Sequence, residues 1–307
     1  MRIAVAGTGG VGGYFGGRLA LAGNEVTFIA RGKHLRAIKE NGLKVKSIRG
    51  DFTVLPAESA ENFDGLKNPD LVLVCVKAWQ VKEIAEKLVP VISENTIVLP
   101  LQNGILAADE LRGFIPGKNI IGGLCRIFSK IESPGVINHM GLDPTIIFGE
   151  SDNSKSERAS NLKKLFDDAG VTSVWAEDIT AEMWKKFLMI CSSALLAVTR
   201  STYGEIREIP ETRTMLKNLF TEIYNTAVAE KVNLKEEIVS ATMSAVDSWD
   251  YNTTSSLTRD VMGGKPSEIE YQNGTVVRLA EKHNIPVPVN KFVYNCILPM
   301  EIRAREK

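Results

Sequence analysis

Histidine is scarce in this chain, and closely spaced pairs of cysteines are absent. Only three histidines occur among 307 residues, and the four cysteines stand far apart without a Cys-x-x-Cys pair. This spacing argues against a zinc site and against a disulfide framework. Each cysteine lies in an apolar segment, so we expect four buried thiols in a reducing compartment and no metal.

An excess of one charge and a long apolar run are also missing. Lysine plus arginine and aspartate plus glutamate each number 37, which removes the long-range attraction that general nucleic-acid binders and polybasic membrane proteins use. The longest mostly apolar run, residues 187–198, is shorter than the ~20 residues of a membrane-spanning helix. The N-terminus has the pattern of a strand and not of a signal peptide. We expect a cytoplasmic protein that binds a small molecule and neither nucleic acid nor membrane.

Up to about Trp175 the sequence alternates short β-branched runs with helical stretches. This alternation predicts a parallel sheet covered by helices. A hairpin insertion is expected at residues 43–55, and residues 120–150 are expected to add antiparallel strands at one edge. The strands of the parallel sheet are expected at residues 2–6, 25–30, 70–76, 95–101 and 171–175.

After Asp178 the pattern changes to helical spacing with almost no strand signal. The length agrees with two domains at a prior of about 150 residues per domain. We predict an α/β, Rossmann-type domain over residues 1–176 and an all-α domain over residues 177–307, with the substrate in the cleft between them. The helices are expected at residues 180–198, 211–230, 234–246, 254–262, 267–283 and 290–303.

A glycine-rich turn follows the first predicted strand and matches G-x-G-x-x-G. The motif is weak alone, but here it connects an N-terminal strand to a helix. Gly7 would allow the tight turn, Gly9 would let the backbone approach a pyrophosphate, and Gly12 would let the helix pack on the sheet. A packing turn without a ligand is the alternative. The predicted cofactor contacts of this turn are Gly7, Thr8, Gly9, Gly10, Val11 and Gly12.

The end of the second predicted strand lacks the acidic residue with which NAD enzymes bind the ribose hydroxyls. Arg31 stands there instead. A guanidinium suits the additional phosphate of NADP through charge-assisted hydrogen bonds. The sequence therefore predicts NADPH/NADP as the cofactor, with a solvated loop charge as the alternative explanation of Arg31.

Two further strands end in polar residues that a ligand could meet. The third strand is followed by Lys77-Ala-Trp-Gln80, and the fourth by Gln-Asn103-Gly. The carboxyl ends of parallel strands share one edge of the sheet, where ligands bind in such folds. Lys77 and Gln80 could reach the adenosine half of the cofactor, and Asn103 the nicotinamide. A surface lysine and a turn-forming Asn-Gly pair explain these residues equally well.

These segments, together with Glu-Met-Trp-Lys-Lys at 182–186 and Glu-Ile-Glu-Tyr-Gln-Asn-Gly at 268–274, resemble the ketopantoate reductase family. The motifs follow the family's order and cover essentially the whole chain. The resemblance implies a Rossmann-type NADP domain followed by a helical domain of the 6-phosphogluconate dehydrogenase type. It implies NADPH-dependent reduction of 2-dehydropantoate to pantoate, a step in pantothenate and coenzyme A biosynthesis. The oligomeric state stays open, a homodimer included.

The resemblance also implies roles for individual residues. Lys186 is similar to the family's catalytic lysine, and Glu268 to the glutamate that contacts the cofactor ribose and the active-site network. Asn103 matches the asparagine between nicotinamide and substrate, and Ser256 stands where the family has a substrate-binding serine. The residues that match positions near the phosphorylated ribose are Arg31, Lys77 and Gln80.

The chemistry itself agrees with a lysine as the acid. Hydride addition to a 2-oxo acid generates an alkoxide, which needs a proton donor and a positive charge nearby. His34, His139 and His283 lie outside the recognisable site segments. An ammonium on a partly buried helix, at Lys186, can serve instead, with Glu268 holding its geometry.

The asparagines with which the family grips its substrate are missing. Ile190, four residues after Lys186 and on the same helix face, replaces one of them, and Ala194 and Tyr203 replace two others. Ile190 is therefore predicted to be an apolar substrate contact. Two alternatives follow: a related reductase for a different, more apolar 2-oxo acid, and a non-catalytic NADP-sensing module. Lys186 and Glu268 argue against the second.

Overall fold

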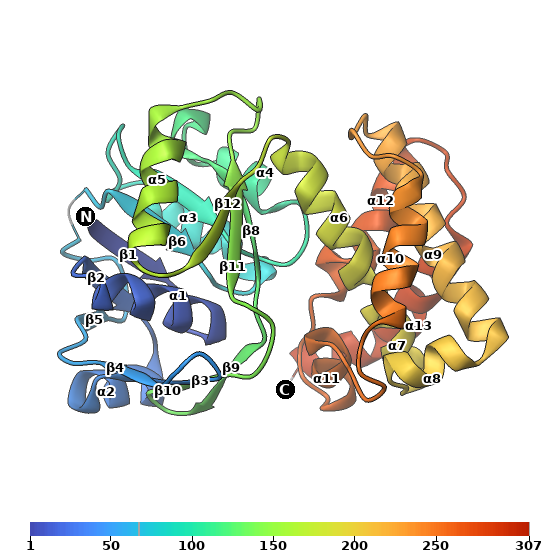
Figure 1. Cartoon of the computed structure of the whole chain (residues 1–307), viewed down its shortest axis with the longest axis horizontal. Coiled ribbons are helices and arrows are strands. Elements are labelled where there is room, and N and C mark those ends of the chain that lie inside the picture. The colour runs from blue at the N-terminus through green and yellow to red at the C-terminus, as the bar shows by residue number, and fades with distance from the viewer. Residues whose placement is uncertain (67, 307) are drawn as a thin grey trace. The chain divides into compact units, whose positions relative to one another are not determined.

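A computed structural model of the chain describes residues 1–66 and 68–306 (Figure 1). It contains two compact units. The α/β unit comprises Met1–Gln102 and Leu106–Ile179, and the helical unit comprises Asn103–Ile105 and Thr180–Lys307. The helical unit thus includes a tripeptide from the middle of the α/β sequence, which a single boundary at residues 176 and 177 does not anticipate.

A five-stranded parallel sheet forms the centre of the α/β unit. Three of its strands, at residues 2–6, 71–74 and 97–100, are almost entirely apolar and buried because helices cover both faces. Four of the five strands are those predicted from the sequence, whereas the strand at Ser59–Ala60 is too short to give a sequence signal. The strand order is β5 (Ser59–Ala60), β2 (Glu25–Ile29), β1 (Arg2–Ala6), β6 (Leu71–Val74) and β7 (Ile97–Pro100).

Alternate residues of β1 face two different apolar cores. Ile3 and Val5 pack in one core, together with the helices at residues 10–21, 32–41 and 157–168. Ala4 and Ala6 pack in another core, together with the helices at residues 81–88 and 107–112. The chain passes from β1 to β2 on one side and reaches β6 on the other. The carboxyl ends of β1 and β6 therefore flank the switch point at which such folds bind ligands. The helices of this unit are α1 (Gly10–Leu21), α2 (Gly32–Asn41), α3 (Val81–Leu88), α4 (Ala107–Arg112) and α5 (Glu157–Asp168), with 3₁₀ turns η1 (Ala78–Gln80) and η2 (Gly117–Asn119).

The other strands form two smaller sheets. The hairpin predicted at 43–55 is confirmed, because β3 and β4 pair antiparallel. Residues 120–150 form the expected antiparallel pairs, but these pairs belong to the two smaller sheets, and Ile120 meets the edge strand of the main sheet through a parallel bridge to Val98. The prediction of a main-sheet strand at 171–175 is wrong, because this strand pairs parallel with β11. A local pattern shows that a strand forms but not which distant strand it pairs with. The two sheets are β4 (Phe52–Val54), β3 (Leu43–Ser47), β10 (Val136–His139), β9 (Ser129–Ser133), and β12 (Thr172–Trp175), β11 (Thr145–Gly149), β8 (Gly122–Arg126).

Helix α1 packs against the parallel sheet and against the four-stranded sheet. A Cβ on Gly16 would lie 2.7 Å from Val5 of the parallel sheet, and a Cβ on Gly13 would lie 2.6 Å from Ile137 of the four-stranded sheet. Real Cβ atoms do not approach other atoms this closely. The glycines therefore let the helix backbone approach both sheets at once.

The helical unit contains all six helices predicted from the sequence. Two of the predicted helices are interrupted, at Ser192 and at Gln272. The helix at Tyr203–Glu208 was not among the predictions, although the sequence carries its start signal, a capping box of Thr202 and Glu205. The elements are α6 (Ile179–Cys191), α7 (Ser193–Thr199), α8 (Tyr203–Glu208), α9 (Pro210–Ala229), α10 (Glu237–Asp247), α11 (Ser256–Met262), η3 (Ile269–Tyr271), α12 (Asn273–Lys282) and α13 (Pro288–Arg305).

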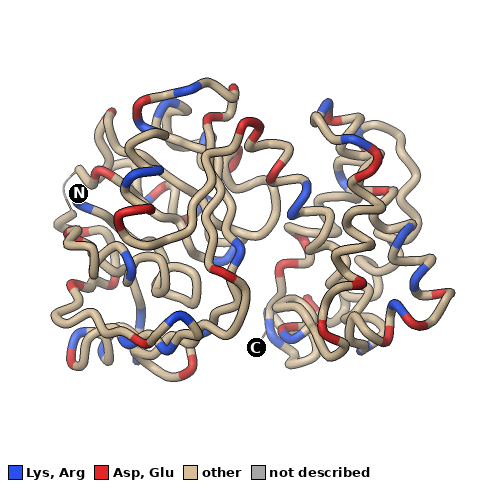
Figure 2. The backbone as a smooth tube through the Cα atoms, in the orientation of Figure 1, with Lys and Arg blue, Asp and Glu red and all other residues tan. Residues whose placement is uncertain are grey.

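The structure bears on the expectations about membrane helices, metal ions and cysteines. Among residues 1–66 and 68–306, no helix is long and apolar enough to cross a membrane, and no group of acidic, histidine and cysteine side chains could hold a metal ion. All four cysteines are free thiols; Cys125 and Cys191 are buried, but Cys75 and Cys296 are only half-buried, which corrects the expectation of four buried thiols. Figure 2 shows lysine and arginine interspersed with aspartate and glutamate in each unit.

Candidate active site

The three glycines of the motif differ in what surrounds them in the turn between β1 and α1. Gly7 has a φ of +101°, and a Cβ there would lie 2.8 Å from Val76 Cγ1, so only glycine fits. A Cβ on Gly12 would overlap the Gly7 carbonyl oxygen. At Gly9, in contrast, a Cβ would meet no protein atom within 4 Å. Protein packing therefore requires the first and last glycines, whereas Gly9 faces open space that a ligand can fill.

Helix α1 begins without a capping side chain. Gly9 is its N-cap residue, no side chain accepts a hydrogen bond there, and its first turn contains no acidic residue. Thr8 is buried, and both its N–H and its Oγ1 donate to the Ile29 carbonyl oxygen, at 3.0 and 2.9 Å. Its hydroxyl thus anchors the turn to the end of β2 instead of capping the helix. An uncapped helix start beside open space fits the pyrophosphate of a dinucleotide.

Arg31 lies at the carboxyl end of β2 and is the N-cap residue of α2. Its guanidinium pairs with Glu83 Oε1 at 3.2 Å, and both side chains are about half-exposed. Hydrogen bonds from Lys87 and then Arg31 lower the pKa of the Glu83 carboxyl. Exposed pairs of this kind stabilise a protein by at most about 1 kcal/mol because solvent screens them. Arg31 can therefore exchange Glu83 for a phosphate at low cost.

The segment after β6 contacts the glycine turn. Val76 contributes the side chain that a Cβ on Gly7 would meet. Lys77 is exposed, with Nζ 5.7 Å from the centre of the Trp79 ring. Gln80 ends the short turn η1, and its N–H donates to the Lys77 carbonyl oxygen at 2.9 Å. Lys77 and Gln80 thus follow directly on a segment that touches the glycine turn.

Gln102 is a functional candidate that the sequence analysis missed. Its Nε2 donates to the carbonyl oxygens of Val74 and Val76, at 2.8 and 3.1 Å, and so fixes the segment after β6. Its Oε1 is buried and has no hydrogen-bond partner among the described residues. A buried amide directly after an apolar strand was the available signal.

Asn103 belongs to the helical unit and contacts Glu268. Its Nδ2 donates to Glu268 Oε2 at 3.4 Å, which is long for such a bond and therefore weak. The next residue, Gly104, has a φ of +101°, and a Cβ there would lie 2.8 Å from the Tyr271 carbonyl oxygen. Glycine at this position lets the Asn103 segment lie against η3. The structure thus brings together two of the predicted site residues that are 165 positions apart.

Lys186 and Ile190 lie on consecutive turns of α6 and on one face of that helix. Both are half-buried. The helix is held from another side by Trp184 and Phe187, which are buried in the helical core with their rings 5.4 Å apart, edge to face. The predicted acid and the predicted apolar substrate contact are therefore neighbours on a well-anchored helix.

Asn273 connects α6 with the segment that carries Glu268. This fully buried residue donates from Nδ2 to the Cys191 carbonyl oxygen at 3.1 Å and to Asn290 Oδ1 at 2.9 Å. Cys191 is the last residue of the helix that carries Lys186. Asn273 was noted in the sequence only as part of a motif, without a role. It holds the two catalytic candidates in one framework.

Ser256 does not cap the helix that it begins. It is exposed at the first position of α11, and the adjacent Ser255 is the cap, accepting from the Thr258 N–H at 3.0 Å. Thr258 donates to the Ser193 carbonyl oxygen at 3.0 Å and ties α11 to α7. No hydrogen bond described in the structure joins Ser256 to Asn103, Lys186 or Glu268.

Ala194 and Tyr203, which replace two of the family's asparagines, are core residues. Ala194 is fully buried, and Tyr203 is 2% exposed with its hydroxyl 2.7 Å from Ser192 Oγ. Burial raises the pKa of Tyr203 to about 12, so the phenol stays neutral. Neither position presents an amide that could grip a polar substrate.

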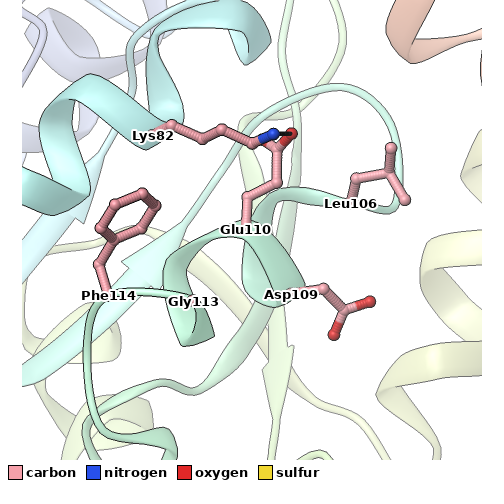
Figure 3. A pocket seen from close by; sticks show the side chains of 6 residues that line it. All are labelled: Lys82, Leu106, Asp109, Glu110, Gly113 and Phe114. Atoms are coloured by element: carbon pink, nitrogen blue, oxygen red, sulfur yellow. Dashed lines mark ion pairs between the residues drawn. The ribbon is translucent and has the colours of Figure 1, made fainter.

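A hollow on the α/β unit contains none of the predicted residues (Figure 3). It is wide open, and Lys82 Nζ lies 3.7 Å from Glu110 Oε1 across it. An open hollow with one ion pair offers neither a proton donor held over a substrate nor an anion site. Its lining residues are Lys82, Leu106, Asp109, Glu110, Gly113 and Phe114.

Known proteins match the chain over both units. The family described as "Ketopantoate reductase PanE/ApbA" matches residues 3–153, and its C-terminal part matches residues 178–301. The 2-dehydropantoate 2-reductase of Pyrococcus abyssi is 30% identical over 311 residues, which cover 100% of both chains. The "Uncharacterized oxidoreductase YkpB" of Bacillus subtilis is 28% identical over 295 residues, which cover 96% of this chain and 97% of that protein.

The fold agrees with these matches. The crystal structure of a PanE/ApbA family ketopantoate reductase from Ralstonia eutropha JMP134 superposes with a TM-score of 0.91 at 29% identity, covering 99% of this chain and 100% of the other. The parallel-sheet unit and the helical unit each correspond to one part of the family. The chain therefore belongs to the ketopantoate reductase family and is an oxidoreductase.

Proposed function

We propose that this oxidoreductase uses NADPH to reduce a 2-oxo acid to a 2-hydroxy acid. The substrate proposed first is 2-dehydropantoate, whose reduction gives pantoate for pantothenate and coenzyme A biosynthesis. One arrangement carries the proposal: the amide of Asn103 contacts the carboxylate of Glu268, and Asn273 ties that segment to the helix of Lys186. Relatives named 2-dehydropantoate 2-reductase support the substrate.

The α/β unit supports a phosphorylated dinucleotide as the cofactor. The open space at Gly9 and the uncapped start of α1 suit a pyrophosphate, and Arg31 supplies a cation where an NAD enzyme would have a carboxylate. When bound, the cofactor supplies the hydride. The residues proposed to hold it are those of the turn 7–12 with Arg31, Lys77, Gln80, Asn103 and Glu268.

The helical unit supplies the proton chemistry in this proposal. Reduction places negative charge on the C2 oxygen of the substrate, which then takes a proton. Lys186 holds that proton on Nζ, and its positive charge stabilises the oxygen as the charge develops. The lysine regains a proton from water, so one turnover consumes one NADPH and one proton. Glu268 is assigned to orienting the ammonium and the cofactor ribose, and Asn103 to orienting the substrate.

A second substrate class is favoured by Ile190. An isoleucine on the face of Lys186, with Ala194 and Tyr203 turned into the core, leaves no amide at these three positions to recognise a substrate hydroxyl. An apolar pocket discriminates against an added hydroxyl by only about 10²-fold. A 2-oxo acid with a plain branched side chain is therefore the competing substrate.

The decisive experiment measures NADPH oxidation over a panel of 2-oxo acids, with NADH in parallel. We expect turnover with 2-dehydropantoate or a branched 2-oxo acid, and faster turnover with NADPH. Lys185→Ala is the matched control for Lys186→Ala, because Lys185 lies on the same helix and pairs with Glu182 at 2.7 Å. If a preparation that binds NADPH reduces none of the acids, the proposed reaction is wrong.

A further inference from the structure

His34 lies outside every motif that predicts function, yet it joins the glycine turn to two other segments. It is in the first turn of α2, with its Nε2 2.8 Å from the Thr8 carbonyl oxygen. The Gly135 N–H donates to its Nδ1 at 2.9 Å. A carbonyl oxygen only accepts and an amide N–H only donates. The imidazole is therefore neutral, with its proton on Nε2.

The other surroundings of the ring agree with this state. His34 is half-buried, and this desolvation lowers its pKa, while the hydrogen bond to Thr8 acts in the opposite direction. Gly135 lies in the turn between β9 and β10 with a φ of +77°, and a Cβ there would lie 3.0 Å from Ala37. The β9–β10 turn is thus packed on α2, so the ring has a fixed partner on each side.

Thr8 is the residue through which His34 reaches the dinucleotide site. Its N–H and Oγ1 are bound to Ile29, and its carbonyl oxygen is bound by His34. The Thr8 carbonyl and the Gly9 N–H belong to one planar trans peptide and point in opposite directions. A hydrogen bond that holds the carbonyl toward His34 therefore turns the Gly9 N–H away from it. Gly9 is also the residue that faces open space.

We propose that His34 is a positioning residue for the dinucleotide, which fixes the Thr8–Gly9 peptide so that the start of α1 is preorganised for pyrophosphate. The inference rests on the proposed use of a nicotinamide dinucleotide. His34 lies three residues after Arg31, so one turn of α2 serves both the pyrophosphate and the additional phosphate. His34 is assigned no contact with a reacting atom, so its hydrogen bonds affect cofactor affinity and not the rate of the chemical step.

Two substitutions of His34 test the proposal, because one removes its hydrogen bonds and the other can keep them. His34→Leu removes both hydrogen bonds, whereas His34→Gln can rebuild both, because its amide nitrogen donates to Thr8 and its oxygen accepts from Gly135. We expect His34→Leu to raise the Kd for NADPH about tenfold. It should leave kcat at saturating NADPH within about twofold of wild type. His34→Gln should restore most of the affinity.

The controls separate positioning from stability. His283→Gln changes a histidine of the helical unit that bonds to Glu230, and it should leave the Kd unchanged. Melting temperatures without cofactor show whether each variant is folded. In the wild type, ¹⁵N NMR of the His34 ring should show an unprotonated Nδ1 and a protonated Nε2, a reading that needs no variant.

Three results would overturn the inference alone: an unchanged Kd in His34→Leu, a Kd in a folded His34→Gln as weak as that of a folded His34→Leu, or a proton on Nδ1 in the wild type. If His34→Leu does not fold, the NMR result and the affinity of His34→Gln decide. A folded wild type that binds neither NADPH nor NADH would refute the proposed function and this inference with it.

Discussion

Alanine at Gly12 and at Gly9 should separate folding from ligand binding within one turn. At Gly12 the new Cβ would overlap the Gly7 carbonyl oxygen and lie 2.8 Å from Val5 Cγ1 and 3.0 Å from Cys75 Cβ. Overpacking of this kind costs about 1–3 kcal/mol, and the better helix propensity of alanine offsets up to about 1 kcal/mol. We expect a net loss of about 2 kcal/mol. For a unit of this size that lowers Tm by about 4–8 °C.

At Gly9 the same substitution meets no protein atom within 4 Å, and the backbone is extended with a φ of −83°. Alanine gains about 0.4–1 kcal/mol by restricting the unfolded chain and loses a similar amount as a poorer N-cap. The free energy of unfolding should therefore change by less than about 0.5 kcal/mol. The methyl group would, however, occupy the space assigned to the pyrophosphate, so the Kd for NADPH should rise about tenfold or more.

Thermal melting without cofactor and fluorescence titration with NADPH measure the two effects independently. Gly117→Ala is a matched control, because a Cβ there also meets no atom within 4 Å but lies outside the turn. It should leave the Kd for NADPH unchanged and raise the free energy of unfolding by at most about 1 kcal/mol. Equal destabilisation by Gly9→Ala and Gly12→Ala would refute the packing argument. Wild-type affinity of Gly9→Ala for NADPH would show that the open space does not hold the dinucleotide.

Three further predictions concern the cofactor, the acid and the substrate. Arg31→Ala should raise the Kd for NADPH about tenfold by removing a charge-assisted contact, and that for NADH less than about twofold; equal losses in titrations with both would contradict the NADP assignment. The free energy of unfolding of Arg31→Ala should differ from that of the wild type by less than about 1 kcal/mol, because the pair between Arg31 and Glu83 is half-exposed. Lys186→Ala should lower kcat by about 10²- to 10⁴-fold without changing the Kd for NADPH. Lys185→Ala should keep its activity, and near-normal turnover of Lys186→Ala would place the proton donor elsewhere. Because Ile190 cannot bond a hydroxyl, kcat/KM for 2-dehydropantoate should lie within about 10²-fold of that for 2-oxoisovalerate, and a preference of about 10⁴-fold would make Ile190 a packing residue.

The fold was predictable where the signal is local. The four longer strands of the parallel sheet consist mostly of apolar residues and are bounded by turn residues. A short window of the sequence is enough to detect this pattern. The pairing partner of Thr172–Trp175 was not predictable, because its pairing with Thr145–Gly149 is a contact between segments distant in the sequence that a local pattern does not specify.

The candidate site shows the same division. Arg31 was predicted because it stands where an NAD enzyme has an acidic residue, and Lys186 because it matches a lysine of the ketopantoate reductase family. Gln102, Asn273 and His34 were not predicted as candidates, because what distinguishes each of them is a hydrogen bond to backbone atoms far away in the sequence. Nothing in the neighbouring residues specifies such a bond. Only the fold brings the two partners together.

The glycines of α1 make the turn before this helix dependent on tertiary packing. Five of the twelve residues of this helix are glycine, which makes it about 4–5 kcal/mol less favourable than an alanine helix. An isolated helix of this length is marginal even without that cost. Its order therefore comes from the two sheets, and one of them contains β9 and β10, more than a hundred residues later in the chain. A nascent chain that ends before His139 has the complete glycine motif but lacks part of the surface on which α1 packs. We therefore expect the turn to gain its full order only when this long-range strand pairing is complete, a step that is slow compared with local structure formation.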